Sequence, residues 1–148
     1  MFKSVLFVCV GNICRSPLAE GLMKHLAETK GIEVKVGSAG IHALVGRAPE
    51  QYSQEIAKEN GFDISNYQAV QITEKIVFDY ELILTLDSMV YDEVVKRYPF
   101  VIGKVKKLGF LQDHQDVADP YLKDRSAFDE MYIHIKQCIN NFISRFYP

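Results

Sequence analysis

A thiol and a guanidinium stand close together near the N-terminus, in the segment CVGNICRSP that contains Cys9 and Arg15. Gly11 and Asn12 within it tolerate left-handed backbone conformations, so the segment can curl its N–H groups inward around an anion. The planar fork of Arg15 matches two phosphate oxygens. A thiolate in such positive surroundings is a strong nucleophile. The segment therefore predicts that Cys9 attacks a phosphoryl group and forms a phosphocysteine, which water then hydrolyses.

Departure of the substrate oxygen needs a proton donor, and the segment Asp119-Pro120-Tyr121 offers one. Pro120 restricts Asp119 to an extended conformation, which keeps the carboxyl group on a loop. There it can donate a proton in the first step and accept one from water in the second. An Asp-Pro pair is equally typical of a plain turn, so the residues alone leave both interpretations open.

The elements on either side of the Cys9 segment can position it. Ser4 to Val8 is a continuous apolar run, typical of a strand that is buried on both faces of a parallel sheet. Ser16 is a favourable N-cap and Pro17 suits the first helical position, so we expect a helix to begin there. Helix N-termini attract anions, and ligands of parallel sheets bind beyond the carboxyl ends of the strands. The turn after the first strand is therefore the expected site.

Strands and helices alternate along the remaining chain, which predicts an α/β fold with a parallel sheet covered on both faces. Beyond the first strand and helix, we expect strands at Glu33 to Ser38, at Tyr80 to Leu86 and within Val101 to Leu108, and helices at Glu50 to Asn60, at Ser88 to Tyr98 and around Phe128 to Phe146. Polar loops connect these elements, and the loop from Gln112 to Arg125 contains Asp119.

Size and composition are those of one ordinary globular domain. The chain has 148 residues, of which 48% are hydrophobic and 24% charged, with a net charge of -2. We therefore expect a single domain over residues 1–148 and no nucleic-acid partner. No apolar run approaches the ~18 residues of a membrane span, so we expect no insertion into a membrane. The three cysteines suit a reducing cytoplasm better than a secreted disulfide framework, and they are too few for a structural metal site.

These motifs resemble those of the low-molecular-weight protein tyrosine phosphatase family. CVGNICRSP is similar to the phosphate loop of the family, Asp119-Pro120-Tyr121 to its acid loop, and Ser38-Ala39-Gly40 to the motif after its second strand. The resemblance covers essentially the whole chain. It implies a three-layer α/β fold with a four-stranded parallel sheet in flavodoxin-like order, and it implies phosphotyrosine hydrolysis without cofactor or metal.

The resemblance also implies catalytic roles for three residues. Cys9 would be the nucleophile, Arg15 would bind the phosphate and the transition state, and Asp119 would be the general acid and then the general base. The remaining phosphate contacts would come from the backbone N–H groups of Val10, Gly11, Asn12, Ile13 and Cys14.

Supporting residues and pocket walls follow from the same resemblance. Asn12 would hold the strained conformation of the loop, Ser16 would hydrogen-bond the nucleophilic thiolate, and Ser38 would support the loop. Tyr121 would form one wall of a phosphotyrosine pocket and Leu44 the other. A Leu at that wall resembles the bacterial subgroup that accompanies autophosphorylating tyrosine kinases of capsule or exopolysaccharide export. This implies a cytoplasmic monomer that acts on a phosphotyrosine protein, in particular a tyrosine kinase with a tyrosine-rich tail.

Some positions depart from the family pattern or allow two interpretations. Tyr67 stands where many members carry a His that supports the phosphate loop, and Val70 stands where an Arg is usual nearby. Cys14 matches a second thiol of the family, which implies reversible disulfide protection of the nucleophile; a buried small residue is the alternative. His42 and His114 fall in loops expected to rim the site, where they either tune pH dependence or are simply exposed.

Three other functions can be weighed on the residues alone. An arsenate reductase of the same fold uses a similar loop but needs two further relay cysteines, and the expected region, Leu82 to Met89, contains none. A phosphotyrosine-binding module without turnover would not need Cys9, Arg15 and Asp119 together. A phosphocarrier would pass its phosphoryl group to another protein, whereas a general acid favours hydrolysis.

Overall fold

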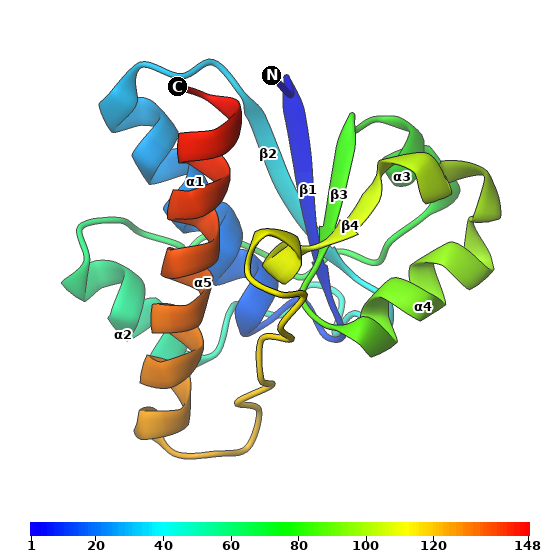
Figure 1. The fold of residues 1–148 in the computed structure, drawn as a ribbon. Helices are drawn as coiled ribbons and strands as arrows, with labels where there is room; N and C mark the ends of the chain where they lie inside the picture. Colours follow the sequence, from blue (N-terminus) through cyan, green and yellow to red (C-terminus); the bar gives the residue numbers. More distant parts are fainter.

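The computed structural model describes residues 1–148, and its centre is a sheet of four parallel strands (Figure 1). The strands are β1 (Ser4–Cys9), β2 (Lys35–Gly40), β3 (Leu82–Thr85) and β4 (Val105–Lys107), in the order β2-β1-β3-β4 across the sheet. The parallel sheet and its flavodoxin-like order are thereby confirmed. In the register of the sheet, Val5 of β1 lies between Val36 of β2 and Leu82 of β3.

Helices cover both faces of the sheet. On one face lie α1 (Arg15–Lys30), α2 (Gln51–Glu59) and α5 (Arg125–Phe146), and on the other lie α3 (Glu74–Phe78) and α4 (Ser88–Arg97) (Figure 1). Two short 3-10 segments, η1 (Pro99–Lys104) and η2 (Leu108–Leu111), flank β4. The result is the three-layer α/β arrangement that was expected. None of these helices combines the length and the apolar character that crossing a membrane requires.

The alternation of side chains along β1 builds a hydrophobic core on each face of the sheet. Val5 and Phe7 belong to the larger core with residues of α1 and α5, whereas Leu6 and Val8 belong to the smaller core with residues of α4. Each of these four side chains is at most 1% exposed, because successive residues of a strand point to opposite faces. The strand is therefore fixed from both sides, and so is Cys9 at its carboxyl end.

The start of α1 differs from the prediction. The helix begins at Arg15 with Cys14 as its N-cap, so the predicted N-cap at Ser16 with Pro17 in the first position was wrong. Ser16 lies inside the first turn, and its hydroxyl contacts the thiol of Cys9 instead of capping the helix. The earlier start places the Arg15 backbone in the helix, which fixes the position from which its side chain extends.

Two further differences concern short elements. The helix α3 was not predicted, because its five residues are too few for a helical period to be recognised. Its start is marked by Thr73, whose hydroxyl accepts a hydrogen bond from the N–H of Ile76. The strand expected at Glu33 to Ser38 forms instead as β2, which continues to Gly40 and so runs alongside the end of β1.

A crevice is expected where the chain leaves β1 and β3. The chain passes from β1 into α1 on one face and from β3 into α4 on the other face. Where the connections of neighbouring parallel strands diverge in this way, ligands bind beyond the carboxyl ends. The segment between η2 and α5, which carries Asp119, runs past this end of the sheet (Figure 1).

Candidate active site

Residues 9–15 form a loop whose carbonyl groups are held on its outer side. The donors are the N–H groups of Ile41, His42, Leu44 and Glu50 and the hydroxyl of Ser53, which bind the carbonyls of residues 9, 10, 11, 13 and 14 at 2.7–3.2 Å. Gly40 allows the close approach, since a Cβ atom there would lie 2.4 Å from the carbonyl oxygen of Val10. Because the carbonyls are occupied outside, the amide N–H groups are left for the interior of the loop.

The interior of the loop presents N–H groups without a partner. Those of Gly11, Ile13 and Cys14 donate to no acceptor in the protein. The N–H of Asn12 donates to Sγ of Cys9 at 3.3 Å. Asn12 has a left-handed backbone conformation, with φ at 59°, as the loop curvature predicted. Successive N–H groups around a concave loop at a helix N-terminus can bind a tetrahedral anion.

A pocket of about 240 Å³ opens over this loop. Its lining consists of Cys9, Val10, Gly11, Ile13, Cys14 and Arg15 from the loop, and of His42, Leu44, Asp119 and Tyr121 from other segments. The structure thus brings the predicted nucleophile, the walls and all the predicted phosphate-binding residues except Asn12 to one pocket. The predicted supporting residues Asn12, Ser16 and Ser38 do not line the pocket, and the side chain of Asn12 hydrogen-bonds both Ser16 and Ser38.

The thiol of Cys9 is surrounded by groups that can donate hydrogen bonds to it. Its Sγ lies 2.8 Å from Oγ of Ser16 and accepts from the N–H of Asn12. The Ser16 oxygen itself accepts from Nδ2 of Asn12 at 2.7 Å, so its proton is free to be donated to sulfur. The sulfur therefore has two hydrogen-bond donors directed at it, one from the backbone and one from a side chain.

A chain of hydrogen bonds supports the loop from behind. Nδ2 of Asn12 also donates to Oγ of Ser38 at 2.9 Å, and Ser38 donates to Glu20 at 2.6 Å. Oδ1 of Asn12 accepts from the backbone N–H of Val70 at 2.9 Å. Tyr67, at the position of the family's His, takes no part in this chain. The backbone of Val70 and the carboxylate of Glu20 provide the support here.

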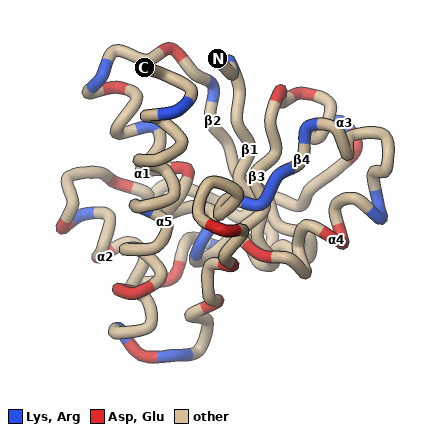
Figure 2. Tube along the Cα trace, viewed as in Figure 1, with Lys and Arg blue, Asp and Glu red and all other residues tan.

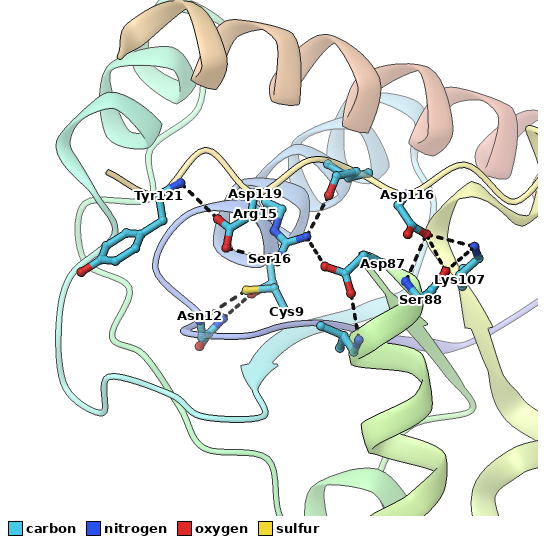
Figure 3. A network of polar contacts seen from close by, with 12 residues as sticks. Cys9, Asn12, Arg15, Ser16, Asp87, Ser88, Lys107, Asp116, Asp119 and Tyr121 are labelled. Atoms are coloured by element: carbon cyan, nitrogen blue, oxygen red, sulfur yellow. Dashed lines mark hydrogen bonds and ion pairs between the residues drawn. The ribbon is translucent and has the colours of Figure 1, made fainter. Parts of the chain in front are cut away.

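Arg15 is held by acceptors that lie far away in the sequence. Its side chain is 2% exposed, and Nη1 donates to Oδ2 of Asp87 at 2.7 Å and to the carbonyl of Val117 at 2.8 Å. Burial alone would lower the pKa of Arg15, but the charge of Cys9 and the hydrogen bond to Asp87 outweigh it, so the pKa is raised. The guanidinium therefore stays charged, and its Nη2 lies 3.8 Å from Oδ2 of Asp119 (Figure 3).

Asp119 reaches the pocket from the segment between η2 and α5. Its side chain is 47% exposed, and its Oδ1 accepts from the N–H of Tyr121 at 3.1 Å. Tyr121 and Leu44 both line the pocket and remain partly exposed, as expected of walls that receive a ligand. Of the two histidines expected at the rim, His42 lines the pocket and His114 does not.

The three cysteines are free and buried, but their surroundings differ. Burial, together with the charge of Cys9, raises the pKa of Cys14 above its ordinary value. Burial raises the pKa of Cys138 to about 11, and its thiol donates to Gln112 at the edge of the larger core. Among the three, only Cys9 has a sulfur that accepts a hydrogen bond from a backbone N–H and contacts a serine hydroxyl.

A sequence model of the family described as low molecular weight phosphotyrosine protein phosphatase matches residues 4–146. The chain belongs to that family. This phosphatase is 37% identical over 145 residues to the probable low molecular weight protein-tyrosine-phosphatase EpsP of Ralstonia nicotianae, a match that covers 98% of this chain and 97% of EpsP.

Solved structures of bacterial members superpose closely on this phosphatase. The tyrosine phosphatase AmsI of Erwinia amylovora does so with a TM-score of 0.91 at 34% identity, covering 98% of this chain and 93% of AmsI. Wzb of Vibrio vulnificus in complex with benzylphosphonate gives a TM-score of 0.92 at 32% identity, covering 99% of this chain and 100% of Wzb. The family, its bacterial subgroup and the fold expected from the sequence are thereby confirmed.

Sequence reasoning missed several residues of this site. Asp87 and Val117 hold Arg15, and Glu20 ends the hydrogen-bond chain behind the loop. Asp87 does carry a recognisable signal, because it follows a buried strand and caps α4 by accepting from the N–H of Val90 at 2.8 Å. Val117 acts through its backbone carbonyl, for which the residue type gives no signal.

Proposed function

We propose that this phosphatase hydrolyses phosphotyrosine in proteins through a phosphocysteine on Cys9, with Arg15 as the phosphate clamp and Asp119 as the general acid and base. The observation that carries the proposal is the loop of unpartnered N–H groups around a thiol that receives hydrogen bonds from Asn12 and Ser16. Such a loop binds an anion and activates a nucleophile at the same point.

In the first step, the phosphate oxygens of the substrate lie on the loop N–H groups and on the guanidinium of Arg15, which stabilise the transition state. Sγ of Cys9 attacks the phosphorus in line, and an S–P bond forms. The P–O bond to the tyrosine breaks, and its electron pair stays on the phenolic oxygen. Asp119 donates its proton to that oxygen, so tyrosine departs as a neutral phenol.

In the second step, water hydrolyses the phosphocysteine. The carboxylate of Asp119 takes a proton from water while the water oxygen attacks the phosphorus. The S–P bond breaks, inorganic phosphate forms, and the Cys9 thiolate is restored with Ser16 and Asn12 as its hydrogen-bond donors. This second role of Asp119 supports hydrolysis over a phosphocarrier, which would pass the phosphoryl group to another protein.

The pocket walls support an aromatic substrate. Leu44 and Tyr121 line the pocket beside the loop, so a phosphorylated phenol ring can pack against apolar and aromatic surface while its phosphate reaches the loop. The absence of relay cysteines between Leu82 and Met89 argues against a reductase on this fold. The presence of Asp119 beside Arg15 argues against a module that only binds phosphotyrosine.

For the cellular role, we infer a single phosphatase domain over residues 1–148 that acts as a cytoplasmic monomer. Its proposed substrate is an autophosphorylated tyrosine kinase with a tyrosine-rich tail. The similarity to the bacterial phosphatases EpsP and AmsI supports this assignment, as does Leu44 at the pocket wall. The free cysteines suit a reducing compartment.

The nucleophile is tested by two matched cysteine variants. Cys9→Ser should abolish hydrolysis of aryl phosphates, measured in the presence of a metal chelator, because serine lacks a thiolate. Cys138→Ser should retain the activity, since that thiol lies in the core away from the pocket. Full activity in Cys9→Ser would refute the mechanism.

A further inference from the structure

Lys107, at the carboxyl end of β4, has each of its ammonium donors matched to an acceptor. Its side chain is 17% exposed. Nζ donates to Oγ of Ser88 and to Oδ1 of Asp116, each at 2.9 Å (Figure 3). It also donates to the backbone carbonyl of His114. An ammonium group has three N–H donors, so none is left over for solvent. The position of Nζ is therefore fixed by two other segments of the chain, the first turn of α4 and residues 114–116.

Two of the three acceptors of Lys107, His114 and Asp116, lie at the base of the acid loop, which is the segment that leads to Asp119. Oδ1 of Asp116 also accepts from the N–H of Ser88 at 3.0 Å and from its hydroxyl at 2.9 Å. Burial alone would raise the pKa of Asp116, but the hydrogen bonds from Lys107 and Ser88 hold it below the ordinary value. The carboxylate thus joins the loop to β4 and to the first turn of α4.

The next residue, Val117, connects the acid loop to Leu86 and to Arg15 of the phosphate loop. Its N–H donates to the carbonyl of Leu86 at 2.9 Å, and its carbonyl accepts from Arg15 at 2.8 Å. Beyond this point the hydrogen bonds of the loop are local, namely from the N–H of Tyr121 to Asp119 and from the N–H of Lys123 to the carbonyl of Pro120. The placement of Asp119 relative to Cys9 therefore depends on how residues 114–117 are held.

Two consecutive residues at the start of α4 contact the two parts of the site, the phosphate loop and the base of the acid loop. Asp87 binds Arg15, and Ser88 binds Asp116 and Lys107. We propose that Lys107, acting with Ser88 and Asp116, is a positioning residue that holds the acid loop so that Asp119 reaches the leaving oxygen. This rests on the proposed function, in which Asp119 is the general acid.

Loss of Lys107 should therefore impair protonation of the leaving group and spare phosphate binding. In Lys107→Met the His114 carbonyl and the Asp116 carboxylate lose their shared donor, and the base of the loop can shift. A displacement of about 1 Å can cost about a hundredfold in rate. The loss should be large for leaving groups that need a proton and small for those that leave as stable anions.

The test compares kcat/KM over a series of aryl phosphates that ends in 2,4-dinitrophenyl phosphate at one side and phosphotyrosine at the other. In Lys107→Met, kcat/KM should fall by about ten- to a hundredfold for phosphotyrosine and change little for the dinitrophenyl ester. Inhibition by inorganic phosphate should stay unchanged. Lys106→Met is the control, since Lys106 is the exposed neighbour on the same strand. Asp116→Asn and Ser88→Ala should show the same trend and decide the matter if Lys107→Met does not fold.

The single variant Asp119→Ala and the double variant Lys107→Met/Asp119→Ala show whether this proposal or the proposed function has failed. If Asp119→Ala shows no dependence on the leaving group, the assignment of the general acid is wrong. If it does show the dependence, Lys107→Met should add little to the loss in the Asp119→Ala background. An additional loss of full size there, or an equal loss for all esters in the single variant, would overturn the positioning role.

Discussion

Asn12 combines a backbone conformation and a side chain that both serve the phosphate loop. Its positive φ curls the loop, and its amide group binds Ser16, Ser38 and the N–H of Val70. Through Ser16 and through its own N–H it also determines the hydrogen bonds that reach the sulfur of Cys9. Its side chain is thus part of the support of the nucleophile, although it does not line the pocket.

Asn12→Ala and Asn12→Gly separate these two contributions. Both variants remove the amide hydrogen bonds and leave buried partners unpaired, so the free energy of unfolding should fall by about 1–3 kcal/mol in each. Alanine should cost about 1 kcal/mol more than glycine, because its Cβ opposes a left-handed conformation. Both should weaken inhibition by inorganic phosphate. Denaturant unfolding and inhibition constants measure these effects, and unchanged phosphate inhibition in Asn12→Ala would contradict the role of this side chain.

At the scale of single residues, the sequence predicts contacts that are local or that involve a distinctive residue type. Cys9, Asn12 and Ser16 lie in one segment, so their proximity follows from a single strand, loop and helix. Arg15 was predicted to bind phosphate, but its partners Asp87 and Val117 were missed, because they are brought to it only by the sheet. Which side chain reaches which atom across the sheet is decided by tertiary packing.

At the scale of elements, the N-terminus of α4 connects helix stability with the catalytic loop. One oxygen of Asp87 caps the helix through the N–H of Val90, and the other binds Arg15. Because β3 and β1 are neighbours in the sheet, Asp87, two residues after the end of β3, can reach the helix that follows β1. The residue that caps α4 therefore also binds Arg15, the phosphate clamp.

Substitution of Asp87 by Asn and by Ala should distinguish these two functions. Asn keeps an oxygen for the cap but loses the charge-assisted bond to Arg15, which is worth about 1.5–3 kcal/mol. Its kcat/KM should therefore fall by about tenfold or more. Ala loses both, so its free energy of unfolding should lie about 1 kcal/mol below that of the Asn variant. Steady-state kinetics and denaturant unfolding check both parts; wild-type kinetics in Asp87→Asn would exclude a role in the clamp.

The elements that the sequence predicted best are those with a long hydrophobic pattern. β1 and α5 have apolar residues over their whole length, and both were expected near their actual positions. The short α3 gave no such pattern. The start of α1 was misplaced because the Ser16-Pro17 pair is typical of a helix start, whereas the hydroxyl of Ser16 is used by the thiol. A local preference was overridden there by a contact of the site.

At the scale of the whole molecule, the site lies at one end of the sheet and both chain termini lie at the other (Figure 1). Acidic and basic residues are interspersed over the helices and loops, and the net charge is -2 (Figure 2). Substrate selection is therefore expected to come from the pocket and its rim rather than from a single charged face. A tag at the C-terminus should leave the pocket accessible.

Trapping with a C-terminally tagged Cys9→Ser variant should identify the partner. This variant keeps the loop N–H groups and Arg15 but cannot form phosphocysteine, so phosphotyrosine peptides should be retained. The double variant Cys9→Ser/Arg15→Met is the matched control, because it lacks the clamp. The proposed partner predicts enrichment of a tyrosine-rich kinase tail, read by mass spectrometry of the retained phosphopeptides. Equal retention by the control would contradict recognition through the phosphate loop.

The most direct test of the mechanism is the chemical identity of the intermediate. The wild-type enzyme is mixed with p-nitrophenyl phosphate, whose leaving group departs easily, so that hydrolysis of the intermediate limits turnover. The reaction is quenched within one turnover, and the digested protein is analysed by mass spectrometry. We predict one phosphoryl group on the peptide that contains Cys9, attached to sulfur. A phosphoryl group on another residue, or an unmodified Cys9 while nitrophenolate is released in a burst, would contradict the account.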